Sequence, residues 1–134
     1  MDIETIREYC LAKPYTCEDF PFDEDTMLFK VGTLTSSEDP SKTCNGKMFG
    51  LMSLSQPDYI ALKCDPEQAI ELRERYPDEI EGAYHMNKKH WNGIRLYRGR
   101  LTDLQLREMI DASYQLVVRS LPKWVRDQMK PFEE

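Results

Sequence analysis

Five basic side chains gathered between positions 85 and 100 are the residues of this sequence best suited to chemistry. The segment HMNKKHWNGIRLYRGR has no Asp or Glu, and its bases are Lys88, Lys89, Arg95, Arg98 and Arg100. Arginine forks match the geometry of phosphate oxygens, and lysine supplies a compact positive charge on a flexible stem. Such a group favours anion binding, and the phosphates of a nucleic acid are the leading candidate.

An aromatic pattern accompanies these bases. Trp91, Arg95 and Tyr97 alternate with Ile94 and Leu96, which predicts a strand with one face on a core and the other face open. Aromatic side chains on an open face can stack on bases. We therefore interpret the preceding loop, the strand and the Arg-Gly-Arg turn as a wing, whose nucleic-acid-binding residues are Lys88, Lys89, His90, Trp91, Arg95, Arg98 and Arg100.

The charge of the whole chain opposes this interpretation. The net charge is −6, and the long-range field of an acidic protein repels phosphate. The alternative is a solvated face on which the bases pair with the acids of 18–25 or of 78–81. The sequence leaves both interpretations open.

Other chemical signals are weak. His85 and His90 are the only histidines, and their spacing is not that of a metal pair. The acidic run at 18–25, which Phe-Pro-Phe interrupts, is predicted to be a loop and lacks the spacing of a calcium site. No nucleophile lies near an acid–base partner in the sequence. We therefore expect no catalytic residue, no metal and no cofactor, and we predict that the protein is not an enzyme.

The cysteines and the hydropathy bear on location. Cys10, Cys17, Cys44 and Cys64 form no C-x-x-C pair, and we expect all four to be reduced. Cys64 lies near the start of a predicted helix, where a thiol pKa falls, but the expected role of this side chain is buried packing. The N-terminal segment lacks the apolar region of a signal peptide, and no apolar run approaches the ~20 residues of a membrane span. We expect a cytoplasmic protein with no membrane partner.

The length of the chain and the positions of helix-capping residues and prolines indicate the architecture. The 134 residues suit one domain, 1–134. Capping and proline signals predict helices from Asp2 to Pro14, from Asp65 to Pro77, and from the capping box Thr102-x-x-Gln105 to Pro122. Strands are predicted at 27–32, 47–54, 59–64, 82–86 and 91–97, with a short amphipathic segment at 123–130. The order α-β-β-β-α-β-β-α favours an α+β domain, an antiparallel sheet with helices packed on one face.

Four segments resemble the MmcQ/YjbR family of small bacterial proteins. They are YCLAKP (9–14), KCDPEQAIELRERYP (63–77), HMNKKHWN (85–92) and DASYQLVV (111–118). The resemblance implies an α+β fold of the CyaY-like or secretion-chaperone-like kind, and a DNA-binding protein of the double-wing type. The matching positions are Asn87, Lys88, His90, Trp91, Asp111, Ser113 and Tyr114, and the family supplies no catalytic residue.

A non-enzymatic nucleic-acid-binding module, with DNA as the partner, is the leading hypothesis. The likeness of the fold to secretion chaperones favours, as an alternative, a protein-interaction module. A third class is a metal-handling protein like the frataxin-type relatives of the fold, and it depends on the acidic run. On the last helix, Ser113 falls on the apolar face, where its hydroxyl is expected to bond to a carbonyl or to a neighbouring strand. The sequence does not indicate the oligomeric state.

Overall fold

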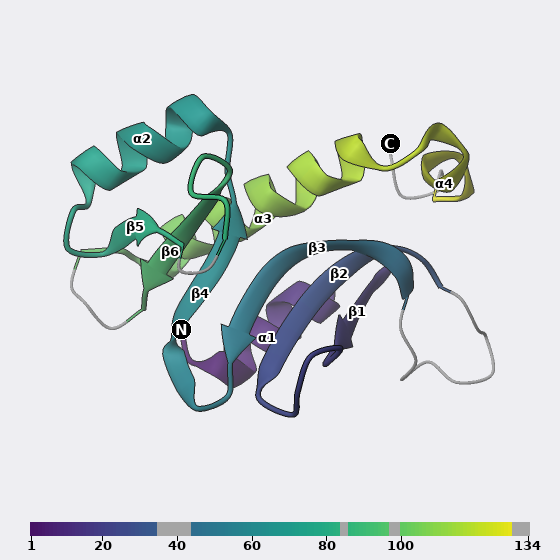
Figure 1. Cartoon of the computed structure of the whole chain (residues 1–134), viewed down its shortest axis with the longest axis horizontal. Coiled ribbons are helices and arrows are strands. Elements are labelled where there is room, and N and C mark those ends of the chain that lie inside the picture. Colours follow the sequence, from purple (N-terminus) through teal and green to yellow (C-terminus); the bar gives the residue numbers. More distant parts are fainter. Residues whose placement is uncertain (35–43, 84–85, 97–99, 130–134) are drawn as a thin grey trace.

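The computed structural model describes residues 1–34, 44–83, 86–96 and 100–129. Its elements are α1 (Ile3–Leu11), β1 (Thr16–Asp19), β2 (Thr26–Leu34), β3 (Cys44–Ser53), β4 (Gln56–Lys63), α2 (Pro66–Arg75), β5 (Ile80–Gly82), β6 (Trp91–Arg95), α3 (Asp103–Ser120) and α4 (Lys123–Gln128). All strand pairs are antiparallel, in the spatial order β1-β2-β3-β4-β6-β5 (Figure 1). The predicted α+β architecture is confirmed.

Three helices begin at the caps that the sequence predicts. Asp2 accepts a hydrogen bond from the amide of Thr5, and Asp65 accepts from the amides of Glu67 and Gln68. Thr102 and Gln105 form a reciprocal capping box at the start of α3. Because each cap satisfies amides that lack a partner inside the helix, it fixes where the helix starts.

Two strands differ from the prediction. β1 lies in a polar stretch that overlaps the run predicted to be a loop, and it pairs with β2 from Thr16↔Val31 to Asp19↔Leu28. Tyr15, with φ of 60°, turns the chain into this strand. β5 begins earlier than predicted, because Ile80 pairs with Ile94 of β6, and positions 84 and 85 of the predicted strand lie outside the described residues. Pairing with a distant strand, rather than local propensity, makes both segments extended.

The core lies between the sheet and helices α1 and α3. Ile6 and Cys10 of α1 and Ile110 of α3 are fully buried in one apolar cluster with Phe29 and Ile60. Figure 1 shows both helices on one side of the sheet. Burial of each large side chain contributes about 1.5–3 kcal/mol relative to exposure, so this shared cluster holds the helices on the sheet.

The cysteines and the helices bear on two further expectations. Cys10 and Cys64 are free, as expected, whereas Cys17 is disulfide-bonded and the prediction of a reduced thiol is wrong there. Spacing along the sequence does not show which cysteines the fold brings together.

Across the part of the chain that the structure describes, no helix combines the length and the apolar character that crossing a membrane requires.

Candidate functional site

The loop before β6 is shaped by Asn87. Its side-chain Oδ1 accepts a hydrogen bond from the amide of Lys89 at 3.0 Å. Its backbone carbonyl accepts from the amides of His90 and Trp91, both at 3.0 Å. An Asn that binds the backbone two residues ahead makes a tight turn. The turn leaves the side chains of Lys88 and Lys89 exposed at the surface.

Arg73 of α2 fastens this loop to the body of the protein. Its Nε donates to Oδ1 of Asn92 at 2.7 Å, and its Nη2 donates to the carbonyls of Lys88 and Trp91. Asn92 is buried on β6 and donates in turn to the carbonyl of Ala69. These acceptors are neutral, so within the described residues no bonded carboxylate cancels the positive charge of Arg73.

Arg73, Lys88 and Lys89 therefore form a group that we call the cation cluster. Among the residues that the structure describes, none of the three makes a salt bridge. They line one shallow groove of about 370 Å³ along α2, together with Pro66, Glu67 and Ile70. Glu67 is the one acid in this lining, so the groove carries a net positive charge within an acidic protein.

Two arginines of the predicted wing are neutralised by acids. Nη2 of Arg95 lies 3.0 Å from Oε1 of Glu81, and the guanidinium stacks on Tyr59 with 5.5 Å to the ring centroid. Nε of Arg100 lies 3.2 Å from Oε2 of Glu79, which also accepts from the Arg100 amide. These are acids of 78–81, so the alternative drawn from the sequence describes both arginines. Contact of Arg95 and Arg100 with nucleic acid stays a prediction. Such contact would require these ion pairs to break.

The other predicted wing residues have mixed surroundings. His90 is half-buried, and its carbonyl accepts from the amide of Cys64 at 2.8 Å. Trp91 is half-buried opposite Lys63 on β4. Arg98 and His85 lie outside the described residues. Within the described ranges, no three His, Cys, Asp or Glu side chains group as metal ligands.

The family-matching residues of α3 attach that helix to its neighbours. Oδ1 of Asp111 accepts from the hydroxyl of Tyr9 at 2.7 Å and from Nζ of Lys13. Burial, followed by the bond to Asp111, raises the pKa of Tyr9 to about 12. The hydroxyl of Tyr114 donates to the carbonyl of Pro14 at 2.7 Å. These contacts orient α1 against α3 and present no open reactive group.

A pocket between α2 and α3 was missed by sequence reasoning. It has a volume of about 250 Å³, and β4 and β6 form its floor. Each lining residue on its own fits a core or a surface position, so no motif marks the pocket. Cys64 lies on its wall, and burial raises the pKa of this thiol, with a further contribution from Asp65. The predicted fall in the pKa of Cys64 is therefore wrong, because desolvation outweighs the helix terminus.

Comparison with known proteins gives consistent matches. A protein-family model described as YjbR matches residues 11–116. The protein YbdF of Escherichia coli O157:H7 is 34% identical over 130 residues, which cover 96% of this chain and 93% of YbdF. YjbR of Escherichia coli strain K12 is 32% identical over 124 residues, 92% of each chain.

Solved structures show the same architecture. The crystal structure of a Deinococcus radiodurans protein superposes with a TM-score of 0.81 and 35% identity, over 95% of this chain and 86% of that one. A crystal structure of a Pseudomonas syringae protein gives a TM-score of 0.66 and 27% identity, over 87% of this chain and 99% of that one. Each match spans most of the chain, so the similarity concerns the fold as a whole.

Proposed function

Because the chain belongs to the YjbR family, we propose that it is a non-catalytic nucleic-acid-binding protein that contacts phosphates through the cation cluster. The observation that supports this proposal is the absence of any salt bridge to Arg73, Lys88 or Lys89 within the described residues. Cations that lack a carboxylate partner are available to phosphate without the cost of breaking an ion pair.

One feature limits the affinity of this interaction, and another limits its specificity. The net charge of −6 repels a polyanion at long range, so we expect weak binding that is strongest at low salt. Phosphate contacts position a protein on DNA and carry no direct information about base sequence. We therefore expect little base preference. A nucleic-acid partner fits the cytoplasmic location that the sequence predicts.

The salt dependence of DNA binding tests the proposal. Each phosphate contact adds about −0.9 to the slope of log K against log salt, so three contacts give about −2.7. The double variant Lys88→Ala plus Lys89→Ala should retain about −0.9. If all five bases of the predicted wing took part, the wild-type slope would instead be about −4.5.

A matched control removes the same charge elsewhere. Arg119 is exposed at the end of α3, and Lys123 is exposed on α4. The double variant Arg119→Ala plus Lys123→Ala should keep the wild-type slope. No binding at low salt, or the same change in slope for both double variants, would contradict the role of the cation cluster.

The alternative of a protein-interaction module is favoured by one side chain. Ile70 is 55% exposed and lines the same groove as the cation cluster. An exposed aliphatic side chain beside positive charge suits an acidic protein partner better than a phosphate backbone. Binding that persists at high salt and is lost in Ile70→Asp would favour this alternative over nucleic acid.

A further inference from the structure

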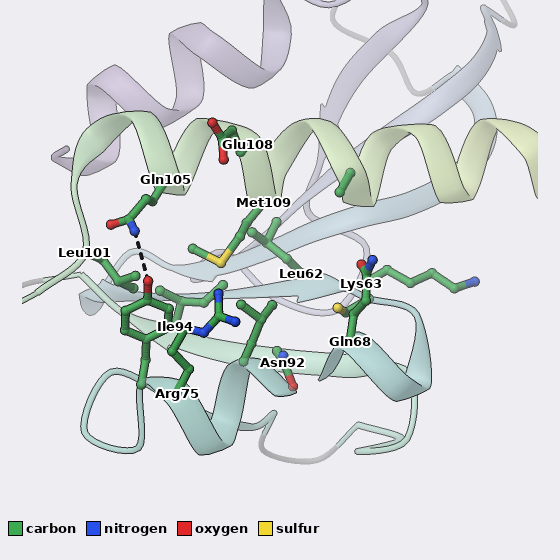
Figure 2. A pocket seen from close by; sticks show the side chains of 14 residues that line it. Leu62, Lys63, Gln68, Arg75, Asn92, Ile94, Leu101, Gln105, Glu108 and Met109 are labelled. Atoms are coloured by element: carbon green, nitrogen blue, oxygen red, sulfur yellow. Dashed lines mark hydrogen bonds between the residues drawn. The ribbon is translucent and has the colours of Figure 1, made fainter. Parts of the chain in front are cut away.

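The pocket between α2 and α3 combines an apolar interior with a structured wall. Leu62, Ile94 and Met109 line its interior, and Tyr76 and Gln105 lie at one side. Figure 2 shows Met109 extending from α3 toward the strands, into the space that these residues enclose. Contact with several apolar side chains favours a ligand that buries an apolar group.

The wall with Tyr76 is held in place by hydrogen bonds. Nε2 of Gln105 donates to the hydroxyl of Tyr76 at 2.9 Å, drawn as a dashed line in Figure 2. Oε1 of the same glutamine accepts from the amide of Thr102 at 2.9 Å. The guanidinium of Arg100 lies over the Tyr76 ring, 5.5 Å from its centroid. The capping box of α3 therefore fixes one side of the pocket before any ligand arrives.

Arg75 supplies a positive charge at the pocket. Within the part of the chain that the structure describes, the guanidinium of Arg75 makes no salt bridge. Figure 2 shows it turned toward the middle of the pocket, whereas Lys63 extends away. Glu108, the acid in the lining, projects from the other side of α3 in this view. An arginine beside an apolar interior suits a carboxylate, which it can bind with two parallel hydrogen bonds.

We propose that this pocket binds a small carboxylic acid with an apolar chain or ring. The carboxylate pairs with Arg75, and the apolar part packs against Leu62, Ile94 and Met109. The volume of about 250 Å³ lies below the 300–1,000 Å³ typical of pockets for drug-sized ligands, so the ligand is small. This site is separate from the cation cluster and does not depend on nucleic-acid binding.

Titration calorimetry with the full chain tests the site, with octanoate as the probe. Octanol and octylamine share the apolar chain and differ in the head group. We expect saturable binding of one octanoate. Octanol should bind about tenfold more weakly, since a hydrogen bond between two charged groups adds more than one that involves a neutral group. Octylamine should bind most weakly, because its head group has the same charge as Arg75. Equal affinities for the acid and the alcohol, or no saturable binding, would overturn the proposal.

Arg75→Gln distinguishes the head-group contact from the apolar pocket. Because this side chain is exposed, the variant should fold normally. We expect about tenfold weaker binding of octanoate with unchanged binding of octanol. Arg119→Gln removes the same charge from the C-terminal end of α3, outside the pocket lining, and should bind octanoate like the wild type. Unchanged octanoate affinity in Arg75→Gln would sink the assignment of the carboxylate to this arginine.

Discussion

The hydroxyl of Ser113 joins two strands from inside the core. It donates to the carbonyl of Phe49 on β3 at 2.6 Å and accepts from the amide of Lys63 on β4 at 2.9 Å. The β3–β4 pairing ends at Gly50↔Leu62, so these two groups lie just beyond it. Ser113 is fully buried. Its hydroxyl bridges the Phe49 carbonyl and the Lys63 amide in place of a further β3–β4 hydrogen bond.

Ser113→Ala removes both hydrogen bonds without creating a large cavity. A buried polar group left without a partner costs about 1–3 kcal/mol. The full penalty applies to the Phe49 carbonyl, because its hydrogen bond to Ser113 is buried. The penalty for the Lys63 amide is smaller, because this amide lies at a partly exposed position. We therefore expect the free energy of unfolding to fall by about 2–4 kcal/mol.

Urea unfolding followed by circular dichroism measures this loss. With a slope of about 2 kcal/mol per molar urea, the midpoint should fall by about 1–2 M and the slope should stay constant. Ser120→Ala is the matched control, because among the described residues the Ser120 hydroxyl bonds to the Val117 carbonyl of its own helix and to no other strand or helix. The control should change the free energy of unfolding by less than about 0.5 kcal/mol. A loss below about 1 kcal/mol for Ser113→Ala would refute the bridging role.

Two further predictions concern the neighbourhood of the wing. The hydrogen bond from Arg100 holds the pKa of the Glu79 carboxyl below its ordinary value of 4.5. The contribution of this pair to stability is therefore present above pH 4.5 and is lost as the pH falls through the lowered pKa. The difference in unfolding free energy between wild type and Glu79→Gln, from urea titrations at several pH values, should shrink on acidification; a constant difference would count against the pair. A Cβ at position 93 would lie 1.8 Å from the hydroxyl oxygen of Tyr59, so Gly93→Ala should displace this ring and cost about 1–2 kcal/mol. In a double-mutant cycle with Tyr59→Ala that cost should largely disappear, and strict additivity would argue against the contact.

Local signals in the sequence were reliable where a few neighbouring residues decide the outcome. The capping box of Thr102 and Gln105 involves residues three positions apart, and it is present as predicted. The alternation around Ile94 places that side chain in the core, as expected for a strand with one buried face. Ser113 was expected to bond to a carbonyl or a neighbouring strand, and it bonds to two strands.

The candidate site was less predictable, because its properties depend on residues far apart in the chain. The partners of Arg95 and Arg100 lie 14 and 21 positions away, and only the fold shows which bases are neutralised. Arg73 was not singled out as a binding residue, since its contact with the loop depends on how α2 packs beside β6. The pocket likewise arises from four elements that meet only in the folded state.

Mapping of amide chemical shifts by NMR tests the central claim most directly. The labelled protein would be titrated with a short DNA duplex at low salt. We predict the largest shifts at Lys88, Lys89 and the adjoining positions around Arg73, with the shifts reversed by added salt. Saturating DNA that leaves these amides unchanged, or shifts confined to another surface, would contradict a phosphate-binding role for the cation cluster.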